Sequence, residues 1–291
     1  MPDNLALAKE DALHLAEQLL RSVGVPPQPQ VVVDLSMELA QPHPDFDAIA
    51  ELVENDPSLA ARALKLVNSA LWGLPKRVES IKHAVAVLGI DTLNSVIITA
   101  ALEESLGCRD DALNQTFWSH SLTVARTARM IAKRVLIMPE FANQAYLAGL
   151  FHDCAIPLFR RKYPDYDEIA RACLRPGETG VEEENRRYDT DHGVVGYLVA
   201  RFWRLPEPVG EAIWFHHDPD LTMHADPVTR TIKAVLLLAD YIAAGDGTLN
   251  EEQEDEAIWC AEHEPVLREL KLTLEDVKDL KDDALIAVGA M

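Results

Sequence analysis

Five histidines and two aspartates in the second half of the chain are residue types well suited to hold a metal ion. Each lies on or at the end of an apolar stretch with helical spacing. Imidazole and carboxylate together suit Fe, Mn, Zn or Ni better than Mg or Ca. If these stretches pack together, the sequence predicts a transition-metal site. Its seven residues, called the cup, are His120, His152, Asp153, His192, His216, His217 and Asp240.

Each cup residue also has a simpler explanation when taken alone. A single histidine on an apolar helix face is more often a hydrogen-bonded core residue than a ligand. Asp240 is different, because it is the one acid in the apolar stretch AVLLLADYIAA, and a buried carboxylate needs a metal or a cation to compensate its charge. The joint pattern therefore favours a shared site. By contrast, His14, His43, His224 and His263 lie in polar settings and are expected on the solvated surface.

Helical periodicity dominates the chain, and neither strand alternation nor internal repeats are found, so the sequence predicts an all-α fold. Asp56 before Pro57 is a strong helix start, and Gly89 ends a helix whose successor is expected to be capped by Asp91. Early helices are expected over 5–22, 31–40, 45–54, 57–69, 80–88 and 91–106. The helices that carry the cup are expected from 118, over 143–153, from 191, over 206–217 and over 234–244.

The segment from 80 to 106 has the order of a helix-turn-helix motif. Its second helix is apolar on most sides, as at Leu93, Val96 and Ile97, and it carries no Lys or Arg to meet phosphates. A packed helical hairpin is therefore the better interpretation.

Composition limits the choice of partners. The chain has 291 residues, and its 48% hydrophobic content is sufficient for a packed core in one large or two modest domains. A formal net charge of −21 disfavours nucleic acid and anionic membrane surfaces. About half of that charge lies between Asp246 and Asp283, where 14 acids and 4 bases give −10. This tail has apolar residues for two short helices and is interpreted as a capping segment, with docking on a partner as the alternative.

Cysteine usage and hydropathy indicate the compartment. Cys108, Cys154, Cys173 and Cys260 are scattered without a paired spacing, which is typical of a reducing environment. The N-terminal segment lacks the uninterrupted apolar core of a signal peptide, and the longest apolar stretches are too short to span a bilayer. We therefore expect a cytoplasmic protein without a membrane partner.

Longer segments resemble a known family. ENDPSLAARALKLVNSALWG, VESIKHAVAVLG, WSHSLTVA, AGLFHD, DHGVVGYLVARFWRLP and AIWFHH occur in this order between about Pro26 and Ala244. They resemble the HDOD family, the HD-related output domain of bacterial signalling in the HD phosphohydrolase superfamily. The resemblance implies an N-terminal helical subdomain packed on an HD-like core and a role in signal transduction. The expected divisions are an N-terminal helix (1–25), the N-terminal subdomain (26–114), the HD-like subdomain (115–245) and the acidic tail (246–291).

Two departures from catalytic members of the superfamily weigh against turnover. Active HD enzymes commonly read HDIGK, whereas Asp153 is followed here by CAIP, so the lysine that would meet a phosphate is missing. Arg160, Arg161 and Lys162 follow a turn or two later and are candidate substitutes. No GYP segment follows His216-His217, which disfavours cyclic di-GMP hydrolysis.

Two functional hypotheses follow from these residues. The favoured one is a non-catalytic output module that acts on an unidentified signalling protein and retains the cup as an inherited site for Fe, Mn, Zn or Ni. The alternative is a metal-dependent phosphohydrolase of a nucleotide or other phosphoester, with Asp153 as the candidate catalytic residue. A helical scaffold with an unrelated partner is a third possibility that the sequence does not separate from the first. No motif for an organic cofactor is found.

Overall fold

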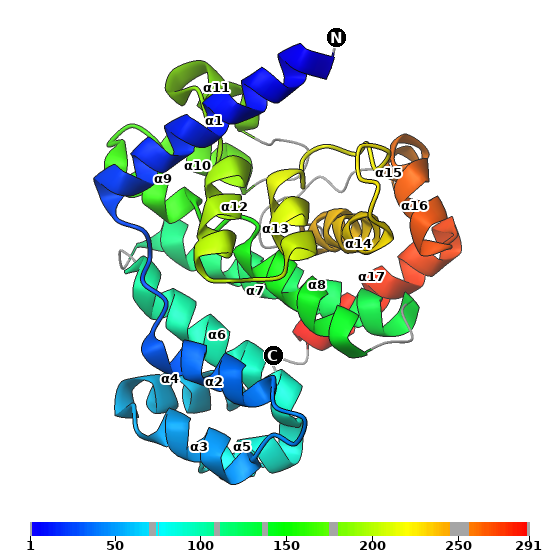
Figure 1. Cartoon of the computed structure of the whole chain (residues 1–291). Helices are drawn as coiled ribbons and strands as arrows, with labels where there is room; N and C mark the ends of the chain where they lie inside the picture. Colours follow the sequence, from blue (N-terminus) through cyan, green and yellow to red (C-terminus); the bar gives the residue numbers. More distant parts are fainter. Residues whose placement is uncertain are drawn as a thin grey trace. The chain divides into compact units, whose positions relative to one another are not determined.

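The computed structural model describes the backbone of residues 2–69, 74, 76–107, 111–135, 139–174, 180–244 and 256–289. These residues form helices, turns and bends without a strand, so the all-α prediction is confirmed (Figure 1). None of the described helices is both long enough and apolar enough to cross a membrane. The helices are α1 (Pro2–Val23), α2 (Gln30–Leu39), α3 (Phe46–Glu54), α4 (Pro57–Val67), α5 (Ile81–Leu88), α6 (Ile90–Leu106), α7 (Ala112–Val135), α8 (Pro139–Phe151), α9 (Ile156–Lys162), α10 (Asp167–Cys173), α11 (Val181–Tyr188), α12 (His192–Phe202), α13 (Glu207–Trp214), α14 (Pro227–Ala244), α15 (Glu256–Glu262), α16 (Glu264–Leu270) and α17 (Leu274–Gly289).

The chain divides into two compact units. The first unit combines Met1–Val25 with Arg109–Leu285, and the second combines Pro26–Cys108 with Ile286–Met291. Helix α1 belongs to the first unit because it packs on α12 and α9. All seven cup residues belong to the first unit, so the site can be described within that unit alone.

Helices α2 to α6 form the second unit, in which α4 packs on α6 and α3 packs on α5. Asp56 caps α4 with its side chain and Pro57 stands at the first helical position, as the sequence predicts. Gly89 ends α5 and precedes α6 with a φ of 77°, a conformation that glycine adopts without strain. The prediction that Asp91 caps α6 is wrong, because the helix already begins at Ile90 and Asp91 lies in its first turn.

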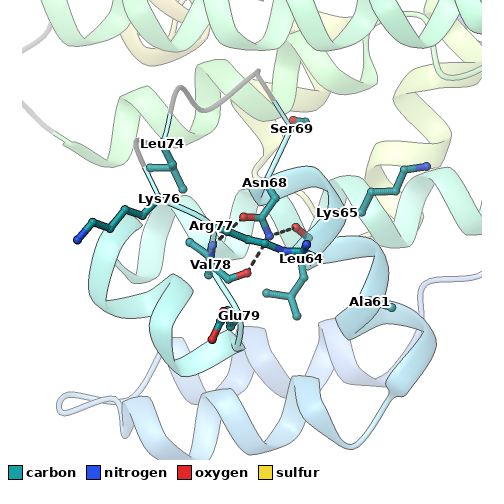
Figure 2. Close-up of a pocket in the computed structure, with 10 residues that line it drawn as sticks. All are labelled: Ala61, Leu64, Lys65, Asn68, Ser69, Leu74, Lys76, Arg77, Val78 and Glu79. Carbon is teal, nitrogen blue, oxygen red and sulfur yellow. Dashed lines mark hydrogen bonds between the residues drawn. The ribbon is translucent and has the colours of Figure 1, made fainter.

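Asn68 holds the segment between α4 and α5 in place. Its amide donates to the carbonyls of Leu64 and Val78 at 2.8 Å, and its oxygen accepts the Val78 amide at 2.7 Å. Beside it lies a surface hollow of about 1310 Å³, shown in Figure 2. This hollow includes no cup residue. Its described lining residues are Ala61, Leu64, Lys65, Asn68, Ser69, Leu74, Lys76, Arg77, Val78 and Glu79.

In the first unit, the most extensive helix packing is that of α7 on α8 and on α14. Helix α13 packs on α12, α14 and α8, so the five helices lie side by side (Figure 1). Apolar residues such as Val124, Ala128 and Ile131 of α7 are completely buried in this packing. The cup lies at the ends or along the inner faces of these five helices, which fixes the backbone from which each side chain projects.

Gly149 allows α8 to approach α7 closely. A Cβ at this position would lie 2.7 Å from the Cα of Ala125 and 2.8 Å from its backbone nitrogen. Because backbone atoms cannot rotate away as a side chain can, an added methyl group would push the two helices apart. The carbonyl of Gly149 also lies 2.7 Å from Nδ1 of His152, so this contact positions a cup residue.

The described residues of the acidic tail form three helices, α15 to α17, where the sequence predicted two. Helix α16 packs on α14. The ring of Trp259 stacks on the rings of Tyr241 and His263, with centroids 4.3 and 4.2 Å apart. Arg134 of α7 pairs with two carboxylates of α17 at 3.2 and 3.3 Å. These contacts attach the described part of the tail up to Leu285 to the first unit.

Two histidines expected on the solvated surface have close partners instead. His224 is only 7% exposed, and its Nδ1 lies 3.3 Å from a carboxylate oxygen of Glu211 in α13. His263 is half-buried and stacks on Trp259. The polar residues around His224 in the sequence gave no sign of burial, because its partner comes from another helix.

Lys233 of α14 holds the segment that follows the paired histidines. Its side chain is completely buried, and its Nζ donates to the carbonyl of Asp220 at 2.8 Å. The Nζ also lies 5.7 Å from the centroid of the Phe215 ring, a cation–π contact. Burial lowers the pKa of Lys233 to about 8, against the opposing effect of the Asp218 and Asp220 carboxylates.

We expect Lys233 to make stability depend on alkaline pH. Its pKa is lower in the folded chain than the ordinary 10.5, so the unfolded chain binds more protons between pH 8 and 10.5. The free energy of unfolding of the native protein should therefore rise relative to that of Lys233→Met across this window. Urea unfolding at a series of pH values measures the difference. Lys278→Met, an exposed lysine of α17, is the control, and a constant difference for Lys233→Met would contradict the assignment.

Gly149→Ala should destabilise the first unit by about 1–3 kcal/mol, because overpacking against backbone cannot be relieved by a rotamer change. The melting temperature should fall by roughly 2–4 °C for each kcal/mol lost. Gly210→Ala is the matched control, since its Cβ would meet ring atoms of Tyr197 at 3.1 Å, which can shift. An equal or smaller loss for Gly149→Ala than for Gly210→Ala would argue against the close contact.

Candidate metal centre

The structure brings all seven cup residues together. Their ligand atoms fall into two groups, within each of which all atoms lie within 4.8 Å of one another. The first ligand group is His120 of α7, His152 after α8 and Asp240 of α14. The second ligand group is Asp153 after α8, His192 at the start of α12, and His216 and His217 after α13.

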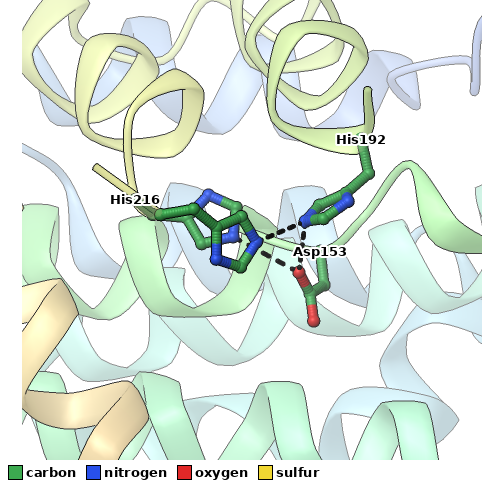
Figure 3. Close-up of side chains that lie close together, drawn as sticks. Asp153, His192 and His216 are labelled. Carbon is green, nitrogen blue, oxygen red and sulfur yellow. Dashed lines mark hydrogen bonds and ion pairs between the residues drawn. The ribbon is translucent and has the colours of Figure 1, made fainter. Parts of the chain in front are cut away.

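Asp153 stands between the two ligand groups. Its Oδ2 lies 3.2 Å from Nε2 of His152 and 3.8 Å from Nε2 of His120. Its Oδ1 lies 3.4 Å from Nε2 of His192 and 3.5 Å from Nε2 of His216. Figure 3 shows part of the second ligand group, in which the rings of His192 and His216 converge on the Asp153 carboxylate. One carboxylate therefore faces both groups, as a bridging ligand does.

Backbone carbonyls fix the orientation of two of these rings. Nδ1 of His152 lies 2.7 Å from the carbonyl oxygen of Gly149, and Nδ1 of His216 lies 2.7 Å from that of Ile213. Because a carbonyl only accepts, each Nδ1 carries the hydrogen, and the Nε2 of a neutral ring keeps its lone pair free. Both carbonyls belong to the residue three positions before the histidine, so the last turn of each helix orients its own ligand.

The convergence of these atoms fits a bound cation. Neither oxygen of Asp153 has a hydrogen bond of normal geometry, and nor does Nε2 of His216, although all three atoms are buried. Lone pairs of a carboxylate and an imidazole that face each other are unfavourable unless a proton or a metal cation lies between them. Ligands about 2.1 Å from one metal ion lie roughly 3.0–3.4 Å apart. The separations around Asp153, 3.2 to 3.5 Å for its three nearest imidazoles, are close to that spacing.

The carboxylate of Asp240, which lies on an apolar helix, is paired with two imidazoles of the cup. Its Oδ1 lies 3.2 Å from Nε2 of His120 and 4.0 Å from Nε2 of His152. The side chain of Asp240 is 34% exposed, whereas those of His120 and His152 are 5% and 1% exposed. Solvent therefore reaches the cup beside Asp240.

Burial and charge together set the protonation of the cup. Burial alone would raise the pKa of Asp153, but the neighbouring imidazoles, led by His152, hold it well below its usual range. Burial lowers the pKa of His216 and lowers that of His217 further, with neighbouring imidazoles adding to the effect. Metal binding requires an ionised Asp153 and neutral imidazoles, and these shifts favour that state at Asp153, His216 and His217. Burial alone would lower the pKa of His152, but the Asp153 carboxylate raises it, so this ring would have to give up a proton on binding a metal.

Sequence reasoning missed a buried carboxylate behind the cup. Glu184 of α11 is completely buried, and its Oε2 lies 2.7 Å from Nδ1 of His192. Burial alone would lower the pKa of His192, but Glu184 raises it well above its ordinary value. Cys173 of α10 completes a third group with these two residues, its Sγ lying 3.9 Å from each. The sequence VEEENRRY reads as a solvated helix, and only contact with another helix distinguishes Glu184 from its acidic neighbours.

The cations proposed to replace the missing lysine have other partners. The guanidinium of Arg160 donates to Asp167 at 2.8 Å and to Asp111 at 3.0 Å. Arg161 donates to the carbonyl of Val23 at 3.4 Å, and Lys162 lies against the ring of Tyr163. Arg160 is thus engaged by two carboxylates, which disfavours its proposed role as a phosphate ligand.

Comparison with known proteins places these features in a family. A family model for the HDOD domain matches residues 25–219. An HDOD domain protein of unknown function from Geobacter sulfurreducens is 26% identical, with 97% of each chain covered and a TM-score of 0.77. A candidate phosphohydrolase from Shewanella amazonensis SB2B (23% identity, 94% of each chain, TM-score 0.69) shares the fold. So does a candidate signal transduction protein from Marinobacter aquaeolei VT8 (22% identity, 98% of this chain and 64% of that one, TM-score 0.74).

Two curated relatives are longer proteins. An uncharacterised protein of Treponema pallidum (strain Nichols) is 25% identical over 236 residues, which are 80% of this chain and 45% of the relative. The uncharacterised protein YuxH of Bacillus subtilis (strain 168) is 26% identical over 147 residues, 48% of this chain and 35% of the relative. The chain thus spans less than half the length of these relatives. Because the HDOD match covers more than half of the chain, and the fold agrees with it, this protein belongs to the HDOD family.

Proposed function

We propose that this chain is a signalling output module of the HDOD type whose cup holds one or two transition-metal ions in a non-catalytic role. Membership of the HDOD family supports the signalling part. The observation that carries the metal part is Asp153, a buried carboxylate on which imidazole nitrogens converge without hydrogen bonds. The mixed imidazole and carboxylate donors favour Fe, Mn, Zn or Ni.

The origin of the cup residues links metal occupancy to the arrangement of the helices. The ligands come from α7, α14 and the segments beside α8, α12 and α13. A ligand shared by all of them favours the one arrangement in which their side chains converge. Loss or exchange of the ion would then change the positions of these helices, which is a state that an output module can pass to a signalling protein.

The residues around the cup argue against efficient phosphoester hydrolysis. The lysine of the HDIGK pattern is absent after Asp153. Arg160, the most buried of the cations that follow, is held by Asp111 and Asp167. A phosphoryl transition state would therefore lack the cation that an HDIGK lysine supplies.

The alternative function is a metal-dependent phosphohydrolase. It is supported by the complete set of ligand candidates and by the partial exposure of Asp240 and His217, which gives water and a small phosphoester a route to the cup. A metal bound there would lower the pKa of a coordinated water and polarise a phosphoryl oxygen. The Shewanella amazonensis protein contributes a likeness of fold alone to this alternative.

The purified protein should contain one or two equivalents of a transition metal by mass spectrometry. Removing the metal with a chelator should lower the melting temperature, because a ligand at 100 times its Kd adds about 2.7 kcal/mol of stability. His152→Ala should lose metal and melt lower, whereas His43→Ala, on the exposed surface of the second unit, should match the native protein. A metal-free native protein whose melting is unaffected by added Zn²⁺, Mn²⁺, Fe²⁺ or Ni²⁺ would remove the basis of the metal site.

Metal-loaded protein should release little or no phosphate from nucleotides and leave cyclic dinucleotides intact, as followed by chromatography of the products. The physical reason is the missing cation after Asp153. Asp153→Asn is the control for contaminating activity. Turnover that Asp153→Asn abolishes, while Arg161→Gln does not, would replace the non-catalytic role with the phosphohydrolase.

A further inference from the structure

Glu184 is a buried acid in an otherwise solvated helix. It is completely buried, while neighbouring residues of α11 such as Glu182 and Arg186 are exposed. Its Oε2 accepts the backbone amide of His192 at 3.0 Å and lies 2.7 Å from Nδ1 of the same residue. The hydroxyl of Tyr166 donates to Oε1. The thiol of Cys173 also lies 3.9 Å from Oε1. Both carboxylate oxygens are therefore occupied by donors, and two of the four donor groups belong to one cup residue.

The charge of Glu184 has no arginine or lysine to balance it among these donors. Placing an ionised carboxylate in a protein interior is costly unless a positive charge or several hydrogen bonds compensate it. The hydrogen bonds come from Tyr166 and the His192 amide. Among the described hydrogen-bond partners of Glu184, only the His192 ring can carry a positive charge, and this ring faces Glu184 with Nδ1 and the second ligand group with Nε2.

The Glu184 contact also fixes which nitrogen of His192 carries the hydrogen. A carboxylate only accepts, so Nδ1 of His192 is the donor. In the neutral ring Nε2 then keeps its lone pair, and this atom lies 2.8 Å from Nε2 of His217 and 3.4 Å from Oδ1 of Asp153. This is the tautomer that a metal in the second ligand group needs.

The two ligand groups differ in this respect. His152 and His216 donate their Nδ1 hydrogens to neutral backbone carbonyls, and Nδ1 of His120 has no hydrogen-bond partner. Among these rings, only that of His192 is backed by a charged acceptor. A carboxylate behind a ligand histidine fixes the ring and strengthens its donation to the metal more than a carbonyl does.

We infer that Glu184, held by Tyr166, is a positioning residue that makes His192 the strongest imidazole ligand of the cup and so raises metal affinity selectively in the second ligand group. This inference rests on the proposed metal site. It adds a residue outside the seven and predicts that the two ligand groups bind metal unequally.

Glu184→Gln isolates the charge of Glu184 from its shape. The backbone amide of His192 requires an acceptor, so it directs the glutamine oxygen to the position of Oε2, where the oxygen still accepts from Nδ1. The glutamine amide then faces the hydroxyl of Tyr166, which can accept. Glu182→Gln removes the same charge from an exposed position of α11 and is the matched control.

The test titrates Co²⁺ alone into chelator-treated protein and follows heat and the visible spectrum. His120→Ala removes a ligand from the first group only and His216→Ala from the second only, so these variants assign the binding events. Glu184→Gln should weaken the second-group event by about 10- to 100-fold, the usual loss for an outer partner of a ligand histidine. It should leave the first-group event unchanged, and Glu182→Gln should leave both unchanged.

Further outcomes separate this inference from the metal site itself. Unchanged second-group affinity in Glu184→Gln, or an equal loss in both groups together with a lower melting temperature of the metal-free variant, would overturn it. A native protein that binds no Co²⁺ would instead overturn the proposed metal site. Nitrogen-15 spectra of the metal-free native protein should show His192 with its hydrogen on Nδ1, and a hydrogen on Nε2 alone would overturn the positioning role whatever the metal result.

Discussion

The buried carboxylate of Asp153 is the constraint on which the first unit depends. It is 2% exposed, is ionised because the surrounding imidazoles lower its pKa, and lies within 4 Å of four imidazole nitrogens. A charge of this kind is stable only if the groups around it are held in place. Several features that look unrelated in the sequence hold the groups around Asp153 in place. They include the close contact at Gly149 and the carbonyls that orient His152 and His216.

Much of this organisation could be predicted from local patterns. The all-α fold and the cap at Asp56 depend on periodicity and on neighbouring residues, and both are seen in the structure. The cup could be proposed because histidine and aspartate are rare on apolar helices, and the structure brings His120 and Asp240 together although they are far apart in the chain. Whether these side chains bind metal stays a prediction.

The features that the sequence did not reveal depend on contacts between helices. Glu184 belongs to a helix whose sequence has no apolar face that would predict its burial. Its side chain is buried against Tyr166, which precedes α10, and His192 of α12. The cap expected at Asp91 failed because Gly89 already turns the chain into α6. Arg160 seemed available for a phosphate only because its partners, Asp111 and Asp167, lie in other segments. In each case the type of the residue could be read from the sequence, but the structural surroundings that decide its role could not.

The order of the cup residues along the chain has a consequence for folding. His120 lies near the middle of α7 and Asp240 near the end of α14, with α8 to α13 between them. Closing so long a loop costs entropy before the contact is gained, so we expect contacts between these distant segments to form late. The complete cup therefore exists only once most of the first unit has folded. An ion that binds it would act mainly on the unfolding rate, extending the lifetime of the native state while leaving the speed of folding nearly unchanged.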